Sequence, residues 1–482
     1  MKVKVQNQPS RRLSRGAATA LRRSGACGLL GAMCAGAAWG QVIAGTSDNA
    51  TAPVTAATSL PVNKAKPGIP SGLADHGLYF RLLYNQEVAG NPSGGIKQGA
   101  TTSQYLAGGV DLDMEKAFGW TGGKLHATMI GIKSKSLTTY YIGGGTSAQE
   151  NSAPFTLLRF LELTYDQNFT IRNKNDFNFT IGRLSAFQTF AKSPFSTLFQ
   201  NHAHSGALYG FSQSSGTALA PVSTWGGKVT YRPTAKTYVH AGSFAIDAAV
   251  TNSATHLWDF GTKSVSGQNY MLETGYETDF SNDAMPRRIR LGAWYLDAPR
   301  NDVYLNTKGQ SFTQFGGTRQ TYRHDRGMYV MGDQTISRPD PNSKRNVAVF
   351  GSFLYNHGNF EPLQYTAKLG IVKTGTFAGR DADTLGLVMS DLSFSNKQVK
   401  FLSERRAKGG GTGTVPSHGY VIEAAYSYAL APGVTIAPNI QYLVNPDSRV
   451  TPNHPTDIPD ALVLGVRFMA NFGALFNFPR GQ

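Results

Sequence analysis

The sequence is poor in cysteine, in charge and in long apolar runs. Its 482 residues include two cysteines, and charged residues make up 16% of the chain, against about a quarter in an average soluble protein. Apolar runs of about 20 residues, which a bundle of membrane helices requires, do not recur along it. Low charge together with a mean hydropathy of −0.26 is also not typical of a disordered chain. These shortages exclude a helical membrane bundle and an extended disordered protein.

The chain begins with a basic leader. An uncharged stretch of small and apolar residues, GACGLLGAMCAGAAW, spans residues 25–39, and small residues flank Trp39. Seven cations precede this stretch: Lys2, Lys4, Arg11, Arg12, Arg15, Arg22 and Arg23. A basic region, a short apolar core and a small-x-small site are typical of a secretory signal peptide. We therefore predict that residues 1–40 are removed, with cleavage near Gly40–Gln41.

Removal of the leader changes what the rest of the chain can do. Both cysteines, Cys27 and Cys34, leave with it, so the mature chain has neither disulfides nor thiolate metal sites. The formal charge of +16 falls to about +9, because seven cations are lost. Residues 41–70 are rich in Ala, Thr, Ser and Pro, and we expect them to form a flexible periplasmic segment.

From Gly77 onward the apolar residues alternate with polar ones. In GLYFRLLYNQEVAGN, Leu78, Phe80 and Leu82 point one way, whereas Arg81, Asn85 and Glu87 point the other. Five further segments alternate in the same way: residues 108–118, 271–278, 287–297, 420–430 and 461–472. The segments have the length of a tilted β-strand that crosses a bilayer. Clusters of Gly, Asn, Asp and Pro separate them, as turns require.

Two architectures produce this alternation: a soluble β-sandwich and a membrane β-barrel. Tyrosines and phenylalanines near the strand ends, and full charges on the polar face, favour the barrel. The connections also alternate between tight, as at Pro432-Gly433, and long, as at 297–328 and 395–418. We predict an all-β fold, a transmembrane antiparallel β-barrel of about 16 strands over residues 71–472, followed by a tail over residues 473–482.

The sequence contains no HExxH, GxSxG or P-loop pattern. The run Gly409–Gly413 lies in a long basic loop without a following helix pattern, and His202-x-His204 lacks a third metal ligand nearby. Arg405, Arg406 and Lys408 in that loop are either solvated or attract lipopolysaccharide phosphates. We therefore predict no enzymatic activity and no cofactor, metal or nucleic-acid partner.

Blocks in order along the chain resemble the carbohydrate-selective porins of the OprB type. The blocks are GLADHG, LLYNQEVAGNPSGG, AFGWTGGKLHATMIG, ELTYDQNFT, FTIGRLSAFQTF, ETGYETDF, RLGAWYLD, DQTISRPD, GRDADTLGL, LAPGVTIAPNIQYLVNP and DALVLGVRF, which run from Gly72 to Phe468. The chain departs from the family pattern at its end, where GALFNFPRGQ follows Phe472 in place of a terminal Phe.

The resemblance implies a sixteen-stranded outer-membrane barrel of a Gram-negative cell that carries mono- and oligosaccharides by diffusion. Sugar hydroxyls need charged or amide partners, and the sugar C–H faces need an aromatic ring, for which Trp294 is the best candidate. The predicted pore-lining and sugar-binding set is Arg81, Asn85, Glu87, Asp111, Asp113, Glu162, Glu273, Arg288, Arg290, Trp294, Arg380, Glu423, Gln441 and Arg467. Expected partners are carbohydrates, outer-membrane lipid and lipopolysaccharide, with a homo-oligomer left open.

Three other functions stay open on the sequence. The excess of cations suits a general or anion-favouring porin, because lumen charge tunes selectivity. A barrel enzyme such as a phospholipase, and a secreted β-sandwich that binds glycans, have weaker support.

Overall fold

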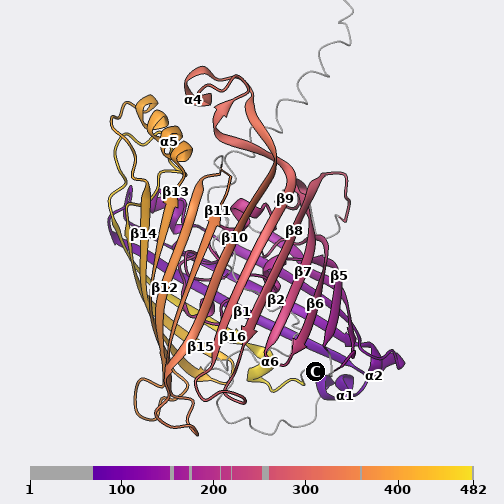
Figure 1. The fold of residues 1–482 in the computed structure, drawn as a ribbon. Helices are drawn as coiled ribbons and strands as arrows, with labels where there is room; N and C mark the ends of the chain where they lie inside the picture. Colours follow the sequence, from indigo (N-terminus) through magenta and orange to yellow (C-terminus); the bar gives the residue numbers. More distant parts are fainter. Residues whose placement is uncertain are drawn as a thin grey trace, which may run out of the picture.

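The protein is a barrel of β-strands (Figure 1). The computed structural model describes residues 69–151, 157–172, 176–206, 208–218, 220–251, 260–358 and 361–479. The strands are β1 Leu78–Ser93, β2 Gly99–Asp113, β3 Gly123–Ser134, β4 Leu157–Phe169, β5 Phe177–Leu184, β6 Thr224–Thr234, β7 Thr237–Asp247, β8 Val265–Glu277, β9 Arg287–Asn306, β10 Arg319–Ser337, β11 Asn346–Asn356, β12 Leu363–Thr374, β13 Thr384–Phe394, β14 His418–Ala431, β15 Val434–Val444 and β16 Ala461–Asn471. The α-helices are α1 Ile69–Asp75, α2 Met114–Phe118, α3 Phe211–Ser215, α4 Phe312–Phe315, α5 Asn396–Lys408 and α6 Phe472–Leu475. The predicted leader and residues 41–68 lie outside the described ranges.

Every strand pairs antiparallel with its neighbours in the chain, and β1 pairs with β16 to close the ring. The closing register runs from Leu83 opposite Asn471 to Ser93 opposite Leu462. The prediction of an antiparallel barrel of about 16 strands is therefore confirmed. Among the described helices, none has the length and apolar character needed to cross a bilayer.

The strands turn their apolar side chains outward. On β1, Val88 is 47% exposed on the outer face, whereas its neighbours Glu87 and Ala89 point inward and are 0% and 1% exposed. On β16, Leu464 is 51% exposed and Val463 is 0% exposed. A soluble sandwich would bury its apolar face, so this exposure excludes the soluble alternative and fits a barrel in lipid.

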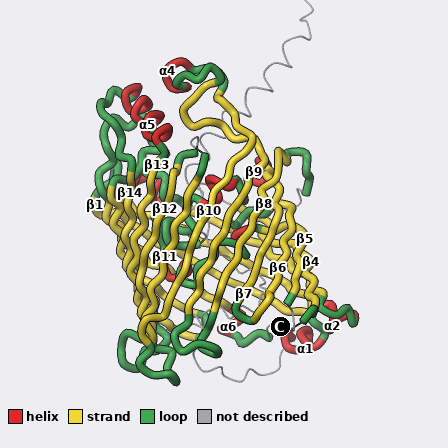
Figure 2. The backbone as a smooth tube through the Cα atoms, in the orientation of Figure 1, coloured by secondary structure: helices red, strands yellow, loops and turns green. Residues whose placement is uncertain are grey.

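The two ends of the barrel differ. At one end, which we call the turn end, the connections include the two-residue turns 235–236 and 432–433, and α1 and α6 lie there (Figure 2). At the other, the loop end, connections such as 185–223 and 395–417 are long. The predicted tight turn at Pro432-Gly433 is present. Gly433 has φ +75°, and a Cβ there would lie 2.7 Å from the Asn471 carbonyl oxygen, so only glycine fits without strain.

Two local predictions were wrong. Residues 297–328 are largely strand, because β9 and β10 continue as a long hairpin beyond the barrel, which carries α4 at its tip (Figure 1). Residues 114–118 form α2 rather than the end of a strand, since Asp113 caps the helix by accepting the amide N–H groups of Glu115 and Lys116. The last strand ends at Asn471, one residue before the predicted limit at Phe472, and α6 Phe472–Leu475 follows it.

Candidate pore constriction

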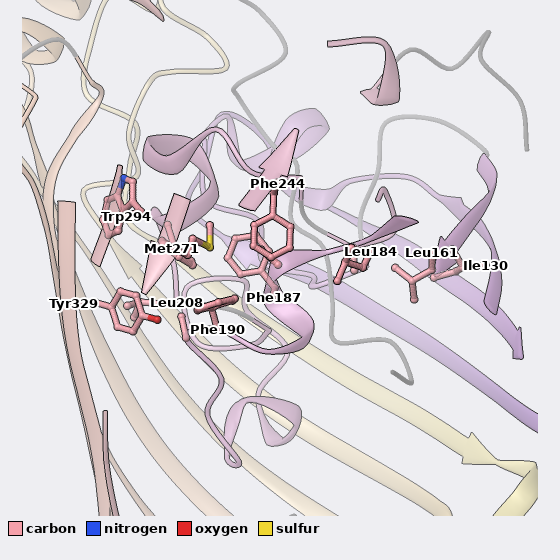
Figure 3. Packing of buried hydrophobic residues seen from close by; sticks show 14 of the residues in the cluster. Ile130, Leu161, Leu184, Phe187, Phe190, Leu208, Phe244, Met271, Trp294 and Tyr329 are labelled. Atoms are coloured by element: carbon pink, nitrogen blue, oxygen red, sulfur yellow. The ribbon is translucent and has the colours of Figure 1, made fainter. Parts of the chain in front are cut away.

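Two loop-end connections fold into the barrel. We call residues 185–223, without residues 207 and 219, the lumen segment. Residues 135–151 lie beside it: the His202 N–H donates to the Ser147 carbonyl oxygen at 2.9 Å. Phe190 and Phe211 of the lumen segment are fully buried. Phe211 lies edge-on to Trp294 of β9, with ring centroids 5.1 Å apart. Figure 3 shows Phe187, Phe190 and Leu208 of the segment in the same cluster as Trp294 and Tyr329. Apolar packing therefore fixes the segment against the barrel wall.

One part of the lumen segment is held by a carboxylate on β8. Glu273, which is 1% exposed, accepts the Ala191 N–H at 2.9 Å. The hydroxyls of Tyr238 and Tyr329 donate to the same carboxylate at 2.8 Å and 2.6 Å. The Arg290 guanidinium donates to the Lys192 carbonyl oxygen alongside. These contacts fix the start of the segment to β7–β10.

A second carboxylate, on β14, holds the middle of the segment. Glu423, which is fully buried, accepts the Gln200 N–H at 2.6 Å and the Asn201 N–H at 3.0 Å. The Asn201 side-chain amide donates to Gln441 Oε1 of β15 at 2.9 Å, and Gln441 Nε2 donates to the Ala148 carbonyl oxygen at 3.0 Å. Because Glu273 and Glu423 lie on separate walls, the segment crosses the lumen between them.

Arg467 of β16 joins these contacts into one network. Its guanidinium lies 3.0 Å from Glu87 of β1 and 2.6 Å from Glu150. It also donates to the carbonyl oxygens of Thr197 and Phe199. Glu87 and Arg467 are 0% and 2% exposed. Four predicted residues, Glu87, Glu423, Gln441 and Arg467, thus meet in a buried network that positions the folded-in loops.

A first polar wall lies nearer the turn end, on β1–β4. Arg81 contacts Asp111 at 2.6 Å, and its Nη2 lies 3.5 Å from Glu162. Thr128 accepts a bond from Arg81 at 3.0 Å, and His126 lies 2.6 Å from Asp111. The side chains of Arg81 and Asp111 are 14% and 16% exposed, so both reach the lumen water.

A second polar wall lies on β6–β10. Arg288 pairs with Asp333 at 2.7 Å, and Arg290 lies 3.9 Å from Glu277. Arg232 completes the set at 2.9 Å from Glu277. The arginine side chains in this wall are between 11% and 19% exposed.

The two polar walls face each other. β1 and β9 are eight strands apart in the ring of sixteen, so Arg81 and Arg288 lie on opposite sides of the barrel. Arg81 lies three residues and Arg288 one residue from the turn-end limit of its strand. Glu273, which holds the lumen segment, is opposite Gly292 in the β8–β9 register, four residues farther toward the loop end than Arg288. The Arg288–Asp333 pair therefore lies between that segment and the turn end, and Arg290 links the second wall to the segment.

The remaining predicted residues lie elsewhere. Asn85 is 3% exposed on the inner face of β1. Asp113 caps α2, and Arg380 lies in the turn after β12, where it contacts Asp383 at 2.6 Å and the ring of Tyr428. Trp294 is 3% exposed in the aromatic cluster (Figure 3), so its ring is covered in this conformation.

Several residues escaped the sequence-based prediction: His126, Arg232, Glu277 and Asp333 of the walls, and Tyr238, which donates to Glu273. The signal for Glu277 was present, because it continues the period of two from Glu273. Arg232 similarly follows Lys228 and Thr230 on the inner face of β6. The partner contacts join residues that are far apart along the chain, such as Arg288 and Asp333, 45 residues apart, and they leave no local pattern.

Comparison with known proteins decides the family. The model of the family described as "Carbohydrate-selective porin, OprB family" matches residues 97–472. The chain belongs to this family.

Relatives of this porin cover most of its length. Porin B of Pseudomonas aeruginosa is 25% identical over 419 residues, which are 83% of this chain and 88% of the relative. The putative porin QuiX of Acinetobacter baylyi is 23% identical over 420 residues, 83% and 90% of the two chains. The high-pH structure of Pseudomonas putida OprB superposes with a TM-score of 0.75 at 23% identity, covering 83% of this porin and 96% of that chain. This likeness supports the fold.

Proposed function

We propose that this porin is a passive channel for glucose and other small sugars, and that its two polar walls bind the sugar in transit. The chain is a carbohydrate-selective porin of the outer membrane by family and fold. The finer assignment rests on one observation: half-buried arginine–carboxylate pairs face each other across the lumen beside the segment that crosses it.

The pairs suit sugar hydroxyls. A guanidinium offers N–H donors in a fixed fork and a carboxylate offers acceptors, so each pair can bind neighbouring hydroxyls that both donate and accept. Their mutual contacts keep either charge from remaining unpaired when no sugar is present. A channel must also release what it binds, so we expect a dissociation constant near the millimolar range, about −4 kcal/mol.

The lengths of the connections at the two ends of the barrel indicate its orientation in the membrane. We assign the turn end, where α1 and α6 lie, to the periplasm, and the loop end to the outside, because outer-membrane barrels have short periplasmic turns and longer external loops. A sugar then meets the lumen segment first and the polar walls afterwards. Transport needs no catalytic step, since the gradient drives it.

Conductance of the refolded porin in a planar bilayer tests this function. We expect glucose to block the conductance steps at millimolar concentration and an amino acid of similar size not to do so. Steps that glucose leaves unchanged would overturn the proposal of a sugar site.

Variants of matched charge locate the site. Arg81→Gln removes a lumen cation that contacts Asp111 and Glu162 of the first wall, and we expect the glucose block to weaken by about 3–10-fold, the loss of roughly one hydrogen bond. Arg380→Gln removes a cation from the periplasmic turn and should leave the block unchanged. Equal effects of the two variants would contradict a site on the polar walls.

A further inference from the structure

A group of basic side chains points outward at the loop-end edge of the apolar surface. On the outer face of β10, Ile336, Val330 and Met328 are 49%, 45% and 55% exposed. The next outward side chain toward the loop end is Arg326, ten residues from Ile336 along the strand. A transmembrane strand needs about 9–11 residues, so Arg326 lies where the hydrocarbon ends and the headgroups begin.

Three further basic side chains lie beside it. Arg323 and His324 of β10 are 63% and 57% exposed. His357, which follows β11, lies with its Nε2 3.0 Å from Arg326 Nη2. We call Arg323, His324, Arg326 and His357 the outer basic patch.

Aromatic rings border the patch. The Tyr295 hydroxyl lies 3.0 Å from His324 Nδ1, and the two rings stack with centroids 5.7 Å apart. Tyr270 is directly opposite Tyr295 in the β8–β9 register, and the two tyrosines are 48% and 43% exposed on the outer face. Tyrosines at this depth mark the membrane interface.

The patch carries more positive than negative charge. Asp297 contacts Arg323 at 2.7 Å and lies 3.6 Å from His324. Asp325, between His324 and Arg326 in the chain, points inward and is 4% exposed. Asp297 therefore offsets the charge of Arg323, whereas the Arg326 guanidinium lies against the ring of His357. An exposed arginine costs little at the interface, about 0–1 kcal/mol, and an anionic headgroup would complement it.

We propose that the outer basic patch binds a phosphate of the glycolipid in the outer leaflet, the phosphorylated lipid A of lipopolysaccharide. The planar guanidinium fork matches phosphate oxygens, and the bordering tyrosines lie at headgroup depth. Because the loop end faces outward in our assignment, the patch meets the outer leaflet.

Two of the three basic residues that the sequence suggested for this role, Arg406 and Lys408, have other contacts. Arg406 is 5% exposed and contacts Asp457, and Lys408 donates to the Thr313 carbonyl oxygen. These contacts hold α5 to neighbouring loops, so the lipid contact belongs to the barrel wall.

Binding of lipid A to the full-length, detergent-solubilised porin, measured by native mass spectrometry, tests the proposal. We expect bisphosphorylated lipid A to bind at least 10-fold more tightly than its phosphate-free form. The double variant Arg323→Gln/Arg326→Gln should lose this preference. Lys373→Gln removes an exposed cation from the outer face near the turn end of β12 and should keep it.

Two results would overturn the proposal. One is equal binding of lipid A by the wild type and the double variant. The other is binding of phosphatidylglycerol as tight as that of lipid A with the same dependence on the arginines, which would assign the patch to any anionic lipid. Heat-resistant migration of each variant verifies a folded barrel. Glucose block is measured separately, so the sugar proposal and the lipid proposal can fail independently.

Discussion

At the scale of the residue, buried carboxylates position the lumen segment. Glu423 is fully buried, yet its two oxygens each accept a backbone N–H, from Gln200 and Asn201. Burial of a charge is unfavourable unless hydrogen bonds and opposite charge compensate it. The N–H groups that compensate the Glu423 charge belong to the lumen segment, which narrows the channel. Loss of these hydrogen bonds would therefore both destabilise the carboxylate and widen the pore.

Glu423→Gln tests this link. The amide keeps the shape but replaces one acceptor oxygen with a donor, which then faces a backbone N–H. We expect the binding of the lumen segment to the barrel wall to weaken by about 1–3 kcal/mol. The single-channel conductance steps should then be larger and noisier. Steps identical to those of the wild type would show that the segment is held without this carboxylate.

At the scale of the element, the lumen segment combines apolar packing with buried histidines. His202 lies edge-on to Tyr209, and His204 Nδ1 lies 3.0 Å from the Ser390 hydroxyl of β13. Lys368 of β12 donates to the His204 carbonyl oxygen at 3.1 Å. Burial lowers the pKa of His202 to about 3, and burial together with Lys368 holds the pKa of His204 well below its ordinary value.

Acid should therefore loosen the segment. The loosened chain takes up protons near the ordinary histidine pKa of about 6.5, whereas the packed imidazoles take them up only at much lower pH. The stabilisation is complete above about pH 6.5 and declines as the pH falls toward 3, with a loss of about 1–2 kcal/mol per histidine by pH 5.

Hydrogen exchange measures this loss. We expect residues 199–206 to lose protection between pH 7 and pH 5, after correction for the intrinsic rate. In the double variant His202→Gln/His204→Gln, the loss of protection between pH 7 and pH 5 should be smaller than in the wild type. A wild-type segment equally protected at both pH values would contradict the prediction.

The turn between β14 and β15 supports a second prediction at this scale. Gly433→Val places a branched side chain at φ +75° and against the Asn471 carbonyl oxygen. We expect a destabilisation of about 1–3 kcal/mol, measured by urea unfolding in lipid vesicles. Lys236→Val, in the other two-residue turn, is the control and should have a smaller effect.

At the scale of the molecule, the barrel carries a cap at its loop end, formed by residues 302–320 of the β9–β10 hairpin and by α5. We expect the barrel to fold and to bind sugar without this cap. The hairpin of β9 and β10 extends past the barrel and contacts α5: Asp302 pairs with Lys397 at 2.6 Å, and Tyr304 donates to Glu404 at 2.7 Å. The polar walls lie toward the opposite end. The cap should therefore influence the loops at the mouth more than the sugar site.

Replacement of residues 302–320 by Asn-Gly tests this separation. We expect a folded barrel with an unchanged glucose block and amide exchange in α5 that is at least 10-fold faster, because α5 loses its contacts with the hairpin, among them those of Lys397, Glu404 and Lys408. A changed glucose block would show that the cap reaches the sugar site.

The sequence predicted the wall of the barrel better than its contents. Alternation on a strand depends on neighbouring residues, so the inward directions of Arg81, Glu273 and Arg467 followed from the period of two. The lumen segment has no such period, and the cover over Trp294 comes from Phe211, a residue of another element. Similarly, no local pattern joins Glu423 to a backbone 223 residues earlier in the chain.

The distance along the chain between the lumen segment and its two carboxylates implies an order of folding. Ala191 binds a carboxylate 82 residues further on, and Gln200 binds one 223 residues further on. The segment cannot be seated until β8 and then β14 are in place, and non-local contacts of this kind form late in folding. Before β14 is in place, the backbone N–H groups of Gln200 and Asn201 lack the Glu423 carboxylate, and we expect the pore to be wider at that stage than in the finished barrel.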